Sequence, residues 1–495
     1  MATVEEPARA TTWPAGLTES RGGGKAFLLG LFMFACLIPI NLYLGEFRVD
    51  PYRLVLLAMF IPAAAYVCAG RAGFVTTTDM LMIGFGLWIM VTLIHHHGQW
   101  GFINGSITVV ELVGAYMLGR MLVRSTEDYR RYIRFFLISL LILLPFALHE
   151  FLTGRWLIGE ALGRIFNVPG YRPIGARFGF SRARVAFSHP ILFGVYCSIG
   201  LANVYYLYRR HIPKAALLVV FVTAMTFSSV SSGPFLAVMV QLGIVAWGLV
   251  MRENWRALLI VAVIGYVTID MLSNRGPILI FLETFTFSSQ TVWSRIHIFN
   301  YGSAEVLRNP ILGIGFNDYE RPRWLTSSVD NYWLLTALRH GLVGFLLLAG
   351  GLLLQLWRIV RAESLSDGAK AARLGYMVTF VGLAFSLSTV HLWNSIASVV
   401  FFFFGAGAFL YTADNVRAEA AAGPASETGA ASPATAPRAA SSYRRPPPPA
   451  MRPPDPAPAT RAPAPAAPAR PAAPLRRTPA EEAAPRTDSA PRYRR

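Results

Sequence analysis

The chain has 495 residues and a formal net charge of +18, yet only 15% of its residues are charged while 54% are hydrophobic. The apolar residues fall in long blocks rather than at amphipathic spacing, a pattern typical of membrane spans of about 20 residues. This pattern excludes a soluble globular domain and predicts an all-α polytopic membrane protein. Cys36, Cys68 and Cys197 each lie inside a predicted span, so the sequence supports neither a disulfide framework nor a cysteine-based metal site.

Hydropathy predicts about twelve spans. They cover, in chain order, residues 26–44, 52–70, 80–95, 101–123, 132–152, 190–208, 215–230, 234–250, 257–272, 331–357, 372–390 and 393–411. Basic residues near span ends are retained in the cytoplasm, and here they follow the even-numbered spans. They are Arg120, Arg124, Arg130, Arg131, Arg134, Arg209, Arg210, Lys214, Arg252, Arg256, Arg358, Arg361, Lys370 and Arg373. Both termini are therefore expected in the cytoplasm.

Composition divides the chain into three parts. Residues 1–24 form a polar N-terminal segment that is too mixed for a cleavable signal, so the first span is expected to stay as an anchor. Residues 25–412 form the membrane-embedded domain. Residues 413–495 are rich in Ala, Pro and Arg and cannot bury a core, which predicts a disordered cytoplasmic tail.

Two long segments, at about 151–189 and 273–330, are expected outside, and both carry more basic residues than the topology favours. Their arginines are Arg155, Arg164, Arg172, Arg177, Arg182 and Arg184 in the first, and Arg275, Arg295, Arg308, Arg321 and Arg323 in the second. A single external arginine is more often a contact to lipid headgroups. Two clusters in the two longest loops favour an anionic ligand, because guanidinium matches phosphate oxygens bidentately.

The second external segment holds most of the candidate chemistry. Arg295 is followed by alternating apolar residues, then by a turn at 309–315 in which Gly313 and Gly315 are expected to let backbone N–H groups approach a ligand. Asp330 and Asn331 precede the next span. Locally, Asp330 is the more ordinary helix N-cap, with its charged form favoured by the helix N-terminus.

Histidines elsewhere have simpler interpretations. His95, His96 and His97 are consecutive, so on a helix they fan out and do not converge readily on one metal. With Trp100 they resemble a belt at the membrane interface. His391 falls in a short external turn and is not expected to be the catalytic base.

The combination of these motifs resembles the superfamily of O-antigen ligases and Wzy-type O-antigen and exopolysaccharide polymerases. The resemblance is carried by Arg295, the Asn-Pro-Ile-Leu-Gly-Ile-Gly turn at 309–315, Asp330-Asn331, and the Gly-Leu-Val-Gly run at 341–344. An earlier run at 184–194, Arg-Val-Ala-Phe-Ser-His-Pro-Ile-Leu-Phe-Gly, is similar to a segment that many polymerase-like members carry. The Ser-Ser-Gly turn at 231–233 fits more weakly.

The resemblance implies a GT-C-like fold with two enlarged periplasmic loops, and an inverting, metal-independent glycosyl transfer at the outer face of the bacterial inner membrane. The donor would be an undecaprenyl-diphosphate-linked glycan. Arg295 and Asp330 would be catalytic, with Arg295 neutralising the diphosphate. The substrate-binding residues would be Arg182, Arg184, His189, Gly313, Gly315 and Asn331.

One departure shapes the functional prediction. Ligases of this superfamily typically have His where this chain has Asp330, which favours polymerisation of repeat units over ligation to lipid A core. Ligation, flipping of lipid-linked sugars and a non-catalytic scaffold remain as alternatives. Expected partners are the lipid-linked glycan, the bilayer and proteins of polysaccharide export or chain-length control; no cofactor, metal or nucleic acid is expected.

Overall fold

The computed structural model describes residues 22–45, 47–166, 168, 175–272, 289–363 and 365–412. The predicted tail, most of the N-terminal segment, Arg172 and Arg275 lie outside these residues. The described part is mostly helical, and eight of its helical segments are long and apolar enough to cross a membrane. The chain is therefore a multi-pass, essentially all-α membrane protein.

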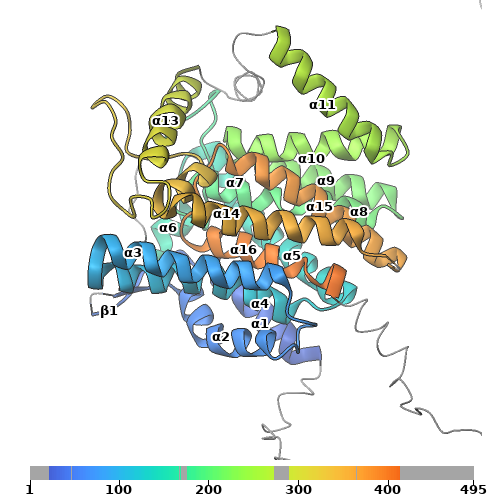
Figure 1. Cartoon of the computed structure of the whole chain (residues 1–495). Coiled ribbons are helices and arrows are strands. Elements are labelled where there is room, and N and C mark those ends of the chain that lie inside the picture. Colours follow the sequence, from blue (N-terminus) through green and yellow to red (C-terminus); the bar gives the residue numbers. More distant parts are fainter. Residues whose placement is uncertain are drawn as a thin grey trace, which may run out of the picture. The chain divides into compact units, whose positions relative to one another are not determined.

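Most helices follow one another along the chain with short connections, while longer segments join α6 to α7 and α13 to α14 (Figure 1). Their bounds are α1 Gly22–Ala35, α2 Pro51–Cys68, α3 Thr77–Val109, the π-helix η2 Val110–Gly114, α4 Ala115–Leu122, α5 Thr126–Thr153, α6 Leu157–Leu162, α7 Pro190–Ser198, α8 Gly200–Tyr208, α9 Ile212–Phe227, α10 Ser232–Val250, α11 Trp255–Leu272, α13 Ser289–Arg308, α14 Tyr332–Arg361, α15 Asp367–Leu387 and α16 Ser395–Ala406.

The first predicted span was too long at its C-terminal end. Helix α1 ends at Ala35, and the chain then forms an antiparallel hairpin of β1 (Leu42–Leu44) and β2 (Phe47–Val49). Pro39 lacks a backbone N–H and cannot continue the helix. Hydropathy detects the apolar residues here but not the change of backbone conformation.

The 46-residue apolar segment Thr77–Leu122 reverses direction at Gly98, which adopts φ 57° and ψ −132°. Beyond the reversal the chain packs back on α3 so closely that a Cβ on Gly101 would lie 1.9 Å from the Leu93 carbonyl oxygen. The segment is thus a helical hairpin, with the reversal in the gap between the predicted spans at 80–95 and 101–123.

Helix α16 forms the centre of the core, and all residues from Ser395 to Ala406 are buried. It packs against α4 at two small residues. A Cβ on Gly119 would lie 2.3 Å from the Phe402 carbonyl oxygen, and one on Gly405 would lie 2.0 Å from that of Tyr116. Small residues allow such close backbone approach where apolar burial cannot drive helix association. Helix α11, in contrast, has no buried residue.

Loops predicted outside gather at one end of the bundle, which we call the α13 end, comprising Gly98 and residues 175–189, 228–231, 309–331 and 388–394. The Arg182 side chain reaches Ser231 and that of Arg295 reaches Thr389. Loops predicted inside contact one another elsewhere, as in the pair Arg210–Asp367. Figure 1 shows α13 and its following loop together at the end of the helices.

Candidate functional site

A serine-rich turn between α9 and α10 anchors two arginines of the first segment that was predicted to lie outside. Arg182 donates a hydrogen bond from Nη2 to the Ser231 hydroxyl at 2.9 Å and another from Nε to the Ser229 carbonyl at 3.4 Å. Arg177 donates to the carbonyl of Val230 at 3.3 Å. Val230 has a positive φ of 41°, uncommon for a β-branched residue, so the turn is held in a strained conformation.

Burial lowers the pKa of Arg182 to about 10, and the nearby charge of Arg177 adds to the effect. His189 lies next to these arginines as the N-cap of α7, where Nδ1 accepts the Ile191 N–H at 3.1 Å. Burial, followed by the charges of Arg182 and Arg184, lowers the pKa of His189 to about 4. The imidazole is therefore neutral at pH 7, with its proton on Nε2.

Arg184 has a different environment from Arg182. It pairs with the Glu150 carboxylate at 3.5 Å, and its guanidinium lies 3.9 Å from the centre of the Trp156 ring. Glu150 also accepts the backbone N–H groups of Arg184 and Val185, at 3.1 and 2.8 Å. This buried set ties the C-terminal end of α5 to the loop, so the geometry gives Arg184 a positioning function, whereas the resemblance implied that it binds substrate.

Arg295 and Asp330 are brought together from two separate segments. Arg295 lies on α13, a helix that the sequence analysis missed, and donates to the Thr389 carbonyl at 3.2 Å. Asp330 accepts a hydrogen bond from Ser328 at 3.2 Å. Burial lowers the pKa of Arg295 and raises that of Asp330, and in each case the other residue's charge acts in the opposite direction. Arg177 is close enough to lower the pKa of Arg295 further.

Asn331, not Asp330, caps α14. The Asn331 side chain accepts the Leu334 N–H at 3.0 Å, which satisfies a free donor of the first turn. Two expectations are corrected by this result. Asp330 is not bound to the helix end, and its charged form is disfavoured by burial rather than favoured by the helix N-terminus. Asn331 has a structural function that fully accounts for its position.

The glycine turn joins α13 to a break in α14. Helix α14 is interrupted at Gly341, which has φ 67° and ψ 179°. The carbonyls of Leu338 and Arg339, left free by the break, accept the N–H groups of Ile314 at 2.7 Å and Gly315 at 3.1 Å. The N–H of Gly313 also stays within the turn, because it donates to the carbonyl of Asn309 at 3.1 Å.

These contacts correct the expected function of the turn. Gly313 and Gly315 both have φ 63°, but their N–H groups bind the protein's own backbone rather than face a ligand. On the α13 side, the Asn309 amide donates to Glu305 at 2.8 Å. The turn therefore fixes α13 against α14, and with it the position of Arg295 relative to Asp330.

The tip of the α3 hairpin supports the same turn. His97 accepts the Phe316 N–H at Nε2 at 2.9 Å, and the two rings lie 5.7 Å apart. Trp100 contacts Phe316 edge-on. The His95–His97 run is thus not simply an interface belt, because His97 has a specific partner more than 200 residues away in sequence.

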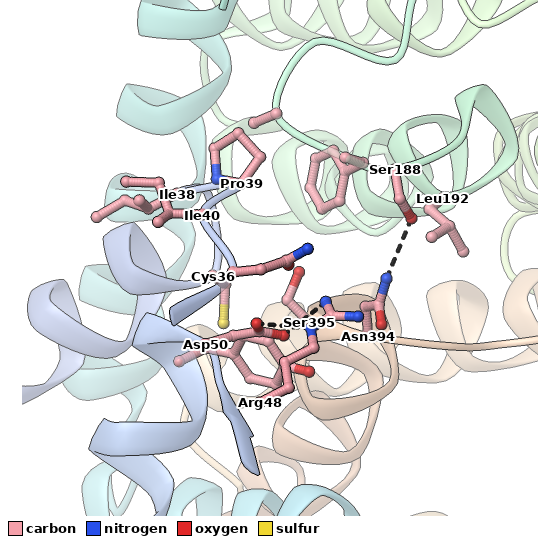
Figure 2. A pocket seen from close by; sticks show the side chains of 14 residues that line it. Cys36, Ile38, Pro39, Ile40, Arg48, Asp50, Ser188, Leu192, Asn394 and Ser395 are labelled. Atoms are coloured by element: carbon pink, nitrogen blue, oxygen red, sulfur yellow. Dashed lines mark hydrogen bonds and ion pairs between the residues drawn. The ribbon is translucent and has the colours of Figure 1, made fainter. Parts of the chain in front are cut away.

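A small polar pocket at this end is shown in Figure 2. Arg48 and Asp50, after the hairpin turn, form two hydrogen bonds of 2.8 Å. Across the pocket, Asn394 donates to the Ser188 hydroxyl at 3.2 Å, and Trp393 donates to the same oxygen at 3.1 Å. Its polar groups largely satisfy one another, so this pocket links the hairpin to the His189 segment and is not the strongest candidate for chemistry.

The candidate site is therefore the region at the α13 end around Arg295, Asp330, Arg182 and His189. The sequence analysis missed the contribution of the α15–α16 turn, whose Thr389 carbonyl holds Arg295. It also gave little weight to Ser231. The available signal was the short polar break between two apolar runs at each of these places. Among the described residues, no three His, Cys, Asp or Glu side chains are arranged to hold a metal.

Comparisons with known proteins add nothing to these observations. No protein-family model matches the chain, and a search of curated proteins finds no match.

Proposed function

We propose that this protein is a membrane glycosyltransferase of the Wzy type, which polymerises undecaprenyl-diphosphate-linked repeat units of an exopolysaccharide or O-antigen at the periplasmic face of the bacterial inner membrane. The observation that carries the proposal is that Arg295 and Asp330 are both partly buried and close enough for each charge to act on the other, while Asn331 rather than Asp330 caps α14. A cation and a carboxylate placed together outside any helix cap suit a reaction that needs a leaving-group clamp and a base.

The reaction is an inverting displacement in this proposal. An acceptor hydroxyl oxygen attacks the anomeric carbon of the donor sugar, and the bond from that carbon to the diphosphate oxygen breaks with its electron pair. Asp330 takes the hydroxyl proton. Arg295 stabilises the charge that develops on the departing undecaprenyl diphosphate. The raised pKa of Asp330 favours this function, since a carboxylate in such an environment is a stronger base than one in water.

Arg182 is the second anion-binding group of the proposal. Its guanidinium lies with Arg177 on the same serine turn, and the charge of Arg177 acts on both Arg182 and Arg295. Neutral His189, with its proton on Nε2, is available as a donor to a sugar or phosphate oxygen. Arg184 supports this set through Glu150.

The proposal includes about twelve spans in a GT-C-like arrangement with cytoplasmic termini. Several features support this number beyond the eight long apolar segments. The segment Thr77–Leu122 doubles back at Gly98, the helices Gly23–Ala35 and Ile212–Phe227 are apolar but shorter, and α15 runs beside α10 and α8.

The test replaces Arg295 by Ala and by Lys in the host, with Arg323→Ala as the matched control, because Arg323 is exposed on the same external segment. We expect both Arg295 variants to accumulate single repeat units on the lipid carrier outside the membrane, since a point charge does not replace the guanidinium fork. Normal polymer from Arg295→Ala would refute the proposal. Accumulation of single repeat units on the cytoplasmic face of the membrane would instead support a flippase.

Ligation is the alternative with the same donor chemistry. Deletion of the gene separates the two: a polymerase deletion loses long chains while single units are still transferred, whereas a ligase deletion leaves chains of normal length on the carrier.

A further inference from the structure

A second pocket lies directly beside the proposed base. It is enclosed by the segment 314–319, by Ser327 and Val329, and by one side of α14 that includes Arg339. Val329 immediately precedes Asp330 in the chain. The cavity measures about 200 Å³, roughly the volume of seven water molecules in the liquid, which is the size class of a single sugar ring.

Arg339 is the unusual group in this pocket. Its guanidinium lies 4.9 Å from the centre of the Phe316 ring, and no described residue gives it a hydrogen bond or an ion pair. Other arginines at the α13 end are engaged: Arg182 binds Ser231, and Arg321 binds Asp318 at 2.6 Å. A guanidinium that has no protein partner and lines a pocket keeps its fork of donors available for an anionic group that enters.

The side chains around Arg339 favour a sugar over an inorganic anion. Asn317 and Ser327 offer groups that bind hydroxyls, and Phe316, whose ring is already covered by Arg339 and His97, forms with Tyr319 an aromatic platform that holds Arg339 in the pocket. Phe316 is held in place by its N–H bond to His97, so the platform is rigid before any ligand binds.

We propose that this pocket binds the acceptor sugar, and that Arg339 recognises a carboxylate on that sugar through a bidentate contact. The acceptor is then an acidic glycan that contains a uronic acid or a comparable carboxylate-bearing sugar. This inference rests on the proposed function, because it identifies the substrate class of the same site. Val329 lines the pocket and Asp330 follows it in the chain, so in this proposal the bound sugar presents a hydroxyl to that base.

The test measures binding of methyl β-glucuronide and methyl β-glucoside to the full-length protein in nanodiscs, without donor. The uncharged glycoside isolates the contribution of the carboxylate. We expect wild type and Arg323→Gln to bind the glucuronide roughly ten- to a hundredfold more tightly than the glucoside, the range for a charge-assisted contact. We expect Arg339→Gln to lose that difference and Arg339→Lys to keep only part of it.

Equal binding of the two glycosides by wild type would overturn the inference, as would an Arg339→Gln variant that still prefers the glucuronide. A measurement on wild type guards against a variant that fails to fold: the glucuronide should protect Arg339, but not Arg323, from modification by phenylglyoxal. Lack of protection also overturns the inference. Arg295→Ala should still bind the glucuronide while losing glycosyl transfer. Transfer that survives in Arg295→Ala would refute the proposed function of Arg295, whereas the binding of the two glycosides tests the acceptor site independently.

Discussion

Replacing Gly341 by Ala should separate α13 from α14 without removing any functional group. A Cβ at this position would lie 1.9 Å from the Ile311 carbonyl oxygen and 2.8 Å from that of Pro310. The residue also has φ 67° and ψ 179°, a conformation that is essentially restricted to glycine and costs an L side chain about 1–3 kcal/mol. Either α14 or the turn must therefore move.

The expected loss can be worked from these contacts. Moving the turn weakens three backbone hydrogen bonds, from Ile314 to Leu338, from Gly315 to Arg339 and from Leu342 to Pro310, at 2.7, 3.1 and 2.7 Å. Each contributes about 0.5–1.5 kcal/mol net. Together with a backbone strain of about 1–3 kcal/mol, we expect the free energy of unfolding to fall by about 2.5–7.5 kcal/mol, the upper value applying if all three bonds are lost.

The assay is denaturation of the purified protein in mixed micelles, paired with polymer length in the host. Gly350→Ala is the matched control, because it lies on the same helix and a Cβ there meets nothing within 4 Å. We expect Gly350→Ala to be at least as stable as wild type, since Ala is the better helix former. A Gly341→Ala protein with wild-type stability and polymer would refute the idea that the turn fixes Arg295 against Asp330.

Two further predictions concern the start of α14 and the start of α7. Asn331→Ala should lower the free energy of unfolding by about 1 kcal/mol through loss of the cap, whereas Asp330→Asn should leave stability nearly unchanged and abolish polymer. The same denaturation and polymer assays check both variants. A stability loss in Asp330→Asn, or loss of polymer only in Asn331→Ala, would contradict the functions given to these two residues. His189 has a pKa of about 4 against an ordinary 6.5, so its contribution to stability is present above pH 6.5 and is lost as the pH falls toward 4. Denaturation at a series of pH values should therefore show a shallower acid decline in His189→Asn, which keeps a capping side chain but does not titrate; identical profiles would show that His189 is not buried in its neutral form.

Much of the membrane architecture was accessible from local sequence. Long apolar blocks marked most helices to within a few residues, because burial in lipid acts on each segment separately. The predicted span at 190–208 coincides with the segment Pro190–Tyr208. Where a backbone change interrupted an apolar block, as after Ala35, hydropathy failed because it measures polarity and not φ and ψ.

Residue types also indicated candidates for chemistry, since Arg182, Arg295 and Asp330 were chosen from their charge, their position and the resemblance of their motifs. Their partners were not accessible in this way. The Glu150–Arg184 pair spans 34 residues and the His97–Phe316 bond spans 219, and nothing local distinguishes Arg184 from Arg182.

What the sequence by itself determined is therefore the class of the protein, the order of its apolar segments and the grouping of arginines in two polar segments between them. What only the tertiary structure decided is the function of each polar residue within them. Asp330 and Asn331 are neighbours, yet one caps α14 while the other faces Arg295. Arg339 is a charged residue in an apolar run until the turn at 309–315 encloses it beside Phe316. The hydrogen-bond partners of a charged side chain and the extent of its burial depend on groups that distant segments bring together, and only the packed structure specifies those groups.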